Sequence, residues 1–142
     1  MTIKKTAHAQ WSGDLKKGKG FISTESGALE KQPYGFNTRF EDKVGTNPEE
    51  LIGAAHSGCF SMALSLALGE KDFVADSIET KAVVSLDEVD GGFEVSHVAL
   101  TVTAKIPDIS DAVFQELCES TKKGCPISKL LNAEISLDAK LI

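Results

Sequence analysis

The sequence has few aromatic residues and few cysteines, and it has more acidic than basic side chains. Aromatic residues make up only 6% of the chain, which predicts a core built mainly from Val, Ile, Leu and Ala. The net charge of −6 argues against nucleic acid or an anionic membrane as a partner, because both require a basic surface. The basic pairs Lys4-Lys5 and Lys16-Lys17 are too short to change this expectation.

The rest of the composition is that of one ordinary soluble domain. The chain has 142 residues, of which 42% are hydrophobic and 25% are charged. No linker-like segment divides it, so we expect a single domain over residues 1–142. No secretory signal is visible, since Lys4 and Lys5 are followed by the polar segment 6–11, and we expect a cytoplasmic protein.

One segment, residues 51–68, has no Asp, Glu, Lys or Arg and reaches the minimum length of a membrane span. It contains His56, three serines and two glycines, whereas a lipid-facing helix would be richer in large aliphatic residues. We interpret it as the central buried helix of a soluble protein.

Three cysteines are present, at positions 59, 118 and 125, and none forms a CxxC pair. An odd number without a signal peptide does not indicate a disulfide scaffold. The histidines at positions 8, 56 and 97 do not have metal-ligand spacing with them, so we expect no metal site and no cofactor. Reactive thiols remain an open possibility.

Hydrophobic periodicity and turn residues predict an α+β fold with largely antiparallel sheets. Asn47, Pro48 and Glu50 form a strong helix start, and Gly69 ends that helix. A change of phase near Ser96 predicts a β-bulge. Strands are expected over 6–11, 20–24, 35–40 (weaker), 78–86, 93–104 and 135–141, and helices over 48–68, 110–123 and from 126.

Position alone leaves the role of each cysteine open. Cys59 lies on an apolar stripe of its helix, which suits a buried structural cysteine as well as a reactive one. Cys125, between a helix stop and Pro126, is either a turn residue or a helix cap whose thiol pKa is lowered by the helix dipole. Cys118 is interpreted as structural. The stripe around Cys59 consists of Ile52, Ala55, Ala63 and Leu66.

Two segments resemble the signatures of the OsmC/Ohr family of hydroperoxide reductases. Residues 47–60, NPEELIGAAHSGCF, are similar to the first signature, and residues 124–128, GCPIS, to the second. The segment 32–40, QPYGFNTRF, resembles the OsmC branch, and the likeness extends over essentially the whole chain. Gly58 departs from the alanine that is frequent before the cysteine, and Cys118 lies outside the family pattern.

The resemblance implies a peroxidase with Cys59 as the peroxidatic residue and Cys125 as the resolving residue. It assigns the active-site arginine and glutamate to Arg39 and Glu49. The implied partners are an organic hydroperoxide, preferred over hydrogen peroxide, and a dithiol reductant of the lipoyl type or another small dithiol. An arginine beside Cys59 would stabilise its thiolate, and a carboxylate would hold the arginine in a two-pronged contact.

The sequence also predicts a homodimer. Glu49 and Cys59 are ten residues apart, a rise of roughly 15 Å in a helix, so Glu49 cannot join the Cys59 of its own helix by direct contact. The family implies an intertwined dimer in which long central helices lie together and Arg39 and Glu49 of one chain serve Cys59 and Cys125 of the other.

Two other functions use the same features. A redox sensor or thiol-exchange protein would employ the same cysteine pair without turnover. A non-catalytic module would use the apolar pocket for a lipid-like ligand, and substitution of Cys59 would not affect it.

Overall fold

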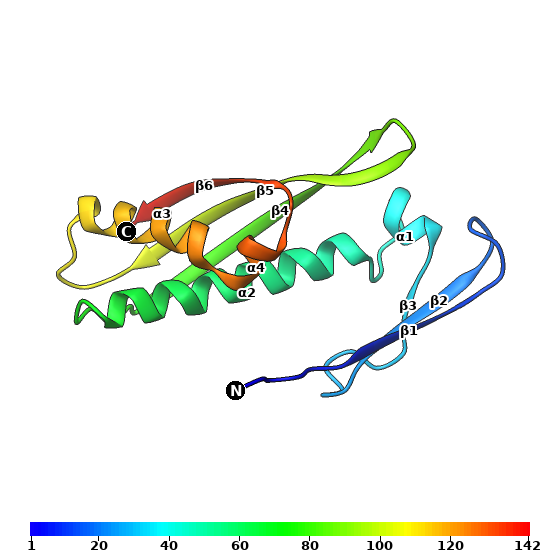
Figure 1. The fold of residues 1–142 in the computed structure, drawn as a ribbon, viewed down its shortest axis with the longest axis horizontal. Helices are drawn as coiled ribbons and strands as arrows, with labels where there is room; N and C mark the ends of the chain where they lie inside the picture. The colour runs from blue at the N-terminus through cyan, green and yellow to red at the C-terminus, as the bar shows by residue number, and fades with distance from the viewer. The chain divides into compact units, whose positions relative to one another are not determined.

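The computed structural model describes residues 1–142, and its elements follow the predicted order of strands, a long helix, two strands, helices and a final strand (Figure 1). The chain divides into two units, residues 1–51 and 52–142. The expectation of a single domain over residues 1–142 stays a prediction.

The first unit contains an antiparallel sheet of three strands in the order β1-β2-β3. Trp11 pairs with Gly20, and Gly20 in turn pairs with Tyr34. A Cβ at Gly20 would lie 2.4 Å from the Tyr34 ring, so only glycine allows the strands to pack in this way. The strands are β1 (Ala7–Ser12), β2 (Lys19–Thr24) and β3 (Gln32–Tyr34).

The strand predicted over residues 35–40 is wrong, because this segment is the short helix α1 (Phe36–Phe40). The Thr38 hydroxyl donates to the Gly35 carbonyl and accepts from the Gly35 amide, both at 3.0 Å, which closes the first turn. Phe36 and Phe40 lie on one face with ring centroids 4.9 Å apart, as residues four apart do in a helix. The strand of this region is β3, which ends at Tyr34, before the segment where the strand was predicted.

The helix α2 (Pro48–Gly69) begins where the sequence predicted. The Glu50 amide donates to Asn47 Oδ1 at 2.8 Å, and Asn47 Nδ2 donates to Glu50 Oε2 at 3.0 Å. Glu50 thus contacts the side-chain amide of the cap residue, a variant of the capping box.

In the second unit, β4 (Ser77–Val89) and β5 (Gly92–Lys105) form a long antiparallel hairpin. Its turn is at Gly91, with φ +89°. Ser85 faces His97 and Leu86 faces Val95, so Ser96 is the extra residue of the predicted bulge.

The last strand, β6 (Glu134–Leu141), pairs with β5 in parallel, so the sheets are antiparallel with this one exception. Between the two strands the chain forms α3 (Asp111–Gly124) and α4 (Pro126–Leu130). A helical crossover of this kind returns the chain to the same end of the sheet, which makes the next strand parallel. The comparison with solved structures below confirms the predicted α+β class.

The core of the second unit lies between one face of this sheet and the helices α2 and α3 (Figure 1). Alternate residues of β5 point into it, because successive side chains of a strand face opposite ways. The fully buried residues of largest volume include Phe60 and Leu64 from α2, Leu100 from β5 and Phe114 from α3.

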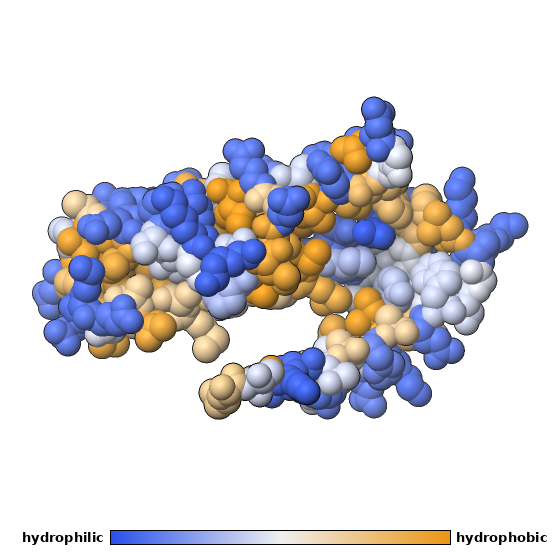
Figure 2. Space-filling model, in the orientation of Figure 1, coloured by the Kyte–Doolittle hydropathy of each residue, from blue (hydrophilic) through white to orange (hydrophobic).

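The helix α2 buries only one of its faces, formed by Gly53, His56, Phe60, Leu64 and Leu68. Met62 and Leu66 are 77% and 67% exposed. By length and composition α2 is the one helix that could cross a membrane, and 28% of its most apolar window is buried inside the structure. Figure 2 shows hydrophobic surface along the side of the second unit on which α2 lies in Figure 1.

In the single chain α2 is therefore buried on one face, and burial of its other faces is expected only in the predicted homodimer. The stripe expected around Cys59 is not part of the core, because Ala55 and Leu66 are exposed and Cys59 is half-buried. The sheet packs against the neighbouring face of the helix, and the stripe around Cys59 remains uncovered.

Candidate active site

The structure brings Cys59 and Cys125 together, although they are 66 residues apart in the sequence. Their sulfur atoms lie 3.0 Å apart, and both are free thiols. Cys59 is half-buried, whereas Cys125 is fully buried. A solute can therefore reach Cys59 more easily than Cys125, and Cys125 is placed to react with whatever forms on Cys59.

Local sequence explains the placement of both thiols. Cys59 lies in the middle of α2, next to Phe60, which anchors that turn in the core. Cys125 ends α3 and caps α4, with Pro126 at the first helical position. The Cys125 amide donates to the Thr121 carbonyl at 2.9 Å, and the Lys129 amide donates to the Cys125 carbonyl at 3.0 Å. The predicted cap is thus confirmed.

The surroundings shift the pKa values of the two thiols in opposite directions. Burial raises the pKa of Cys59, and the hydrogen bond with the Cys125 thiol raises it further. Burial also acts to raise the pKa of Cys125, but its contacts with Cys59, Ser128 and Ile127 outweigh this effect, so that pKa is lowered. Every group that acts on Cys59 here belongs to the second unit, and none is a cation. A low pKa at Cys59 therefore requires a positive charge from elsewhere.

Cys118 is chemically inert. It is fully buried in the core beside Phe114, and burial together with the Asp111 carboxylate raises its pKa to about 12. A thiol with that pKa carries almost no thiolate at neutral pH.

Arg39 and Glu49 form the second pair of predicted site residues, within the first unit. Arg39 Nη2 donates to Glu49 Oε1 at 2.7 Å, and Arg39 Nε lies 3.2 Å from both carboxylate oxygens. This is the two-pronged contact that fixes the plane of a guanidinium. The Glu49 side chain is 14% exposed and that of Arg39 is 36% exposed, so the cation remains accessible.

An apolar hollow of about 160 Å³ lies beside Arg39 in the first unit. Aromatic rings form much of its wall, and a charged group faces it only at Arg39. Such a hollow suits the organic part of a small molecule whose polar end meets the guanidinium. Its lining includes Trp11, Leu15, Tyr34, Phe36, Phe40 and Pro48.

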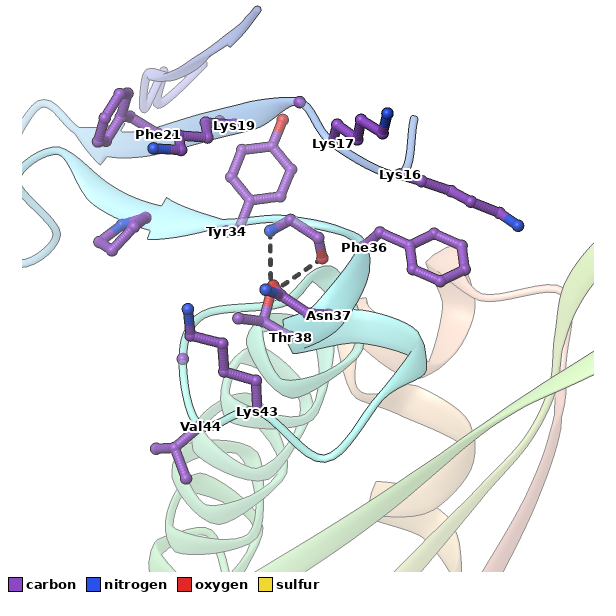
Figure 3. A pocket seen from close by; sticks show the side chains of 15 residues that line it. Lys16, Lys17, Lys19, Phe21, Tyr34, Phe36, Asn37, Thr38, Lys43 and Val44 are labelled. Atoms are coloured by element: carbon purple, nitrogen blue, oxygen red, sulfur yellow. Dashed lines mark hydrogen bonds between the residues drawn. The ribbon is translucent and has the colours of Figure 1, made fainter. Parts of the chain in front are cut away.

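A larger hollow of about 380 Å³ in the same unit is lined by four lysines (Figure 3). The ammonium groups of Lys16, Lys17 and Lys19 point in different directions in Figure 3. They do not converge on one anion, so this hollow lacks the geometry of an anion site.

Sequence reasoning missed a third feature, a buried pair behind the two cysteines. His56 Nε2 and Ser128 Oγ lie 2.7 Å apart, and both side chains are buried. His56 lies three residues before Cys59, and Ser128 lies three residues after Cys125. On helices this spacing puts each residue on the same side as its cysteine, a signal that could have found the pair.

A sequence profile of OsmC-like proteins matches residues 40–140. The chain belongs to the OsmC-like protein family. It is 57% identical over 141 residues to peroxiredoxin OsmC of Escherichia coli K12, with 99% of each chain covered. It is therefore a homologue of that peroxiredoxin.

Solved structures of the OsmC/Ohr family share the fold. The crystal structure of the organic hydroperoxide resistance protein OhrB of Bacillus subtilis matches with a TM-score of 0.68 and 28% identity, covering 95% of this chain and 98% of that one. An organic hydroperoxide resistance protein of Elizabethkingia anophelis matches with a TM-score of 0.72 and 26% identity, with 100% of each chain covered. The resemblance identified from the two cysteine segments is confirmed.

Proposed function

We propose that this protein is a thiol-dependent peroxidase that reduces organic hydroperoxides, and hydrogen peroxide more weakly, in oxidative and osmotic stress defence. The observation that carries the proposal is the thiol pair, with a half-exposed Cys59 3.0 Å from a buried Cys125. The names of its relatives, a peroxiredoxin and an organic hydroperoxide resistance protein, support the same activity.

In the first step the Cys59 thiolate attacks the outer oxygen of the hydroperoxide. The O–O bond breaks, the alkoxide leaves and takes a proton to become the alcohol, and Cys59 becomes a sulfenic acid. Only a thiolate is nucleophilic enough for this attack. Cys59 takes this role because it is the more accessible thiol of the pair.

In the second step Cys125 attacks the sulfenic sulfur, a disulfide forms, and water leaves. A dithiol reductant, of the lipoyl type or another small dithiol, then restores both thiols. Because the sulfur atoms are already 3.0 Å apart, this step requires only a small further approach.

The apolar hollow beside Arg39 supports a preference for organic peroxides. Its aromatic wall offers an apolar surface to an alkyl or aryl group, and hydrogen peroxide gains nothing from such a surface. The guanidinium beside it can hold the peroxide oxygens and can stabilise the Cys59 thiolate.

The proposal includes a homodimer. Met62 and Leu66, three and seven residues after Cys59 on α2, are apolar side chains that the single chain leaves exposed. A second copy of the same helix would bury them, as expected for an exposed apolar patch of this kind. We place Arg39 and Glu49 of one chain at Cys59 and Cys125 of the other, and we place the dimer in the cytoplasm.

The test of the activity is turnover of tert-butyl hydroperoxide with excess dithiol. We expect Cys59→Ser to have no turnover, because an alcohol is not ionised at neutral pH. Cys125→Ser should complete one attack and accumulate the Cys59 sulfenic acid, which dimedone traps. Cys118→Ala is the matched control and should retain turnover. Full activity in Cys59→Ser, or no turnover in the wild type, contradicts the proposal; the latter outcome would favour a sensor.

The test of the shared site mixes Cys59→Ser subunits with Arg39→Ala subunits after unfolding and refolding them together. A mixed dimer has one intact site only if Arg39 serves the partner's thiol pair. We therefore expect the mixture to turn over faster at pH 7 than either parent, since Cys59→Ser is inactive and Arg39→Ala is slowed. A mixture no faster than Arg39→Ala alone would contradict the shared site.

A further inference from the structure

The buried pair of His56 and Ser128 lies behind the resolving thiol and has no part in the steps described above. Ser128 lies on α4, whose N-cap is Cys125, and His56 lies on α2, one turn before Cys59. His56 is fully buried and Ser128 is 7% exposed. A buried histidine requires a hydrogen-bond partner, and Ser128 supplies one to His56.

The hydrogen bonds identify the tautomer of His56. Nε2 lies 2.7 Å from Ser128 Oγ, and Nδ1 is buried without a hydrogen-bond partner. Burial lowers the pKa of His56, so the ring is neutral at pH 7 and carries a single N–H. A buried N–H without a partner is rarer than a buried acceptor without one, so Nδ1 is the bare nitrogen and Nε2 carries the proton.

This tautomer makes the Ser128 hydroxyl an acceptor toward His56. Because His56 Nε2–H donates to Ser128 Oγ, the hydroxyl proton of Ser128 is free to point elsewhere. The Ser128 side chain, three residues after Cys125, is among the groups that lower the pKa of the Cys125 thiol. The buried pair also ties the helix that carries Cys59 to the helix that Cys125 caps, where the two sulfur atoms lie 3.0 Å apart.

We infer that His56 and Ser128 are positioning residues that hold Cys125 as an aligned thiolate for its attack on the oxidised Cys59. This inference rests on the proposed peroxidase function. In the step concerned, the Cys125 thiolate forms the S–S bond, the S–O bond of the Cys59 sulfenic acid breaks, and the departing hydroxide takes a proton to become water. The Cys59 sulfur is reduced and the Cys125 sulfur is oxidised, so no other oxidant or reductant is needed.

Other charged groups lie on the elements around Cys125. They are Glu70 after α2, Glu119, Lys122 and Lys123 on α3, and Lys129 on α4. Lys122 pairs with Glu119 at 2.8 Å. The Cys125 pKa is set instead by burial and by its contacts with Cys59, Ser128 and Ile127. Ser128 is therefore the group whose removal tests the inference.

The first experiment titrates Cys125 by the ultraviolet absorbance of its thiolate in the Cys59→Ser background. The pKa of Cys118 is about 12, so that thiol does not titrate in the same range. We expect Ser128→Ala to raise the Cys125 midpoint by about one pH unit, which is a tenfold loss of thiolate below the midpoint. Ser128→Thr, which keeps the hydroxyl, should restore most of the shift. This measurement does not depend on peroxidase activity, so its failure is distinct from failure of the proposed function.

The second experiment follows conversion of sulfenic acid to disulfide after one equivalent of tert-butyl hydroperoxide. Ser128→Ala should slow this conversion about tenfold at pH 7, and the loss should shrink as the pH rises. His56→Gln, whose amide can still donate to Ser128, should lose less.

The control is Ser136→Ala, which removes a second histidine–serine contact, that of His97 Nε2 with Ser136 Oγ at 2.8 Å in the sheet. It should match the wild type in both experiments. An unchanged Cys125 midpoint in Ser128→Ala, or an equal effect of Ser136→Ala, would overturn the inference.

Discussion

Replacement of Arg39 by alanine tests the electrostatic basis of the proposed mechanism. The ordinary pKa of a cysteine is near 9.0, and burial raises that of Cys59. A guanidinium about 4 Å from a thiolate contributes about 4 kcal/mol at an effective dielectric constant of about 20, which corresponds to about 3 pKa units. Because the Arg39 side chain is 36% exposed, solvent screening reduces this value, and we expect a shift of about 1–3 units.

The sign of the effect follows from the thiolate fraction. In the proposed dimer, Arg39 of one chain lowers the pKa of Cys59 in the other chain, so the thiolate dominates at a lower pH. In Arg39→Ala the midpoint of the first step should move up by about 1–3 pH units, with a reduced rate at pH 7. The reduction should disappear once the pH exceeds both midpoints.

The assay measures the first-step rate with tert-butyl hydroperoxide against pH in the Cys125→Ser background, where Cys59 titrates without its coupled neighbour. Arg39→Lys keeps the charge but loses the two-pronged contact with Glu49, so its midpoint should lie between those of the wild type and alanine variants. Lys19→Ala, which removes an exposed cation of the same unit, is the control. The same midpoint in the wild type and Arg39→Ala would refute the reasoning.

Three further predictions concern stability, Cys118 and assembly. Leu64→Ala, at a fully buried position, should lower the free energy of unfolding by about 2–5 kcal/mol in urea titrations, and Val74→Ala, at an exposed one, should change it little. Cys118→Ala should leave the pH profile of turnover unchanged, because that thiol does not ionise in the working range. Met62→Glu should convert the dimer to monomers in sedimentation experiments by placing a charge in the proposed interface, and an unaltered dimer would exclude this face.

Features specified by neighbouring residues could be predicted from the sequence. The start of α2 follows from Asn47 and Glu50, whose contacts span three residues. The bulge at Ser96 follows from a break in alternation, and the cap at Cys125 follows from Pro126. Each feature depends on residues within about one turn of helix or a few residues of strand. The identity of neighbouring residues is therefore sufficient to predict it.

The segment 35–40 shows where local patterns are ambiguous. Its aromatic and glycine residues suit a short strand, but the contacts of Thr38 with Gly35 close a helical turn instead. A local side-chain contact decides between such alternatives here, because a few residues of either type differ little in intrinsic stability.

The sequence by itself predicted the order of the elements except α1, the family, and the pair of cysteines that the structure brings together. Only the tertiary structure decided that β6 runs parallel to β5, that Cys59 lies at the edge of the core beside an uncovered stripe, and that His56 reaches Ser128. Those features depend on pairs of residues far apart in the chain, 72 residues in the case of His56 and Ser128. Periodicity reports which face of an element is apolar, but it does not report which other element covers that face.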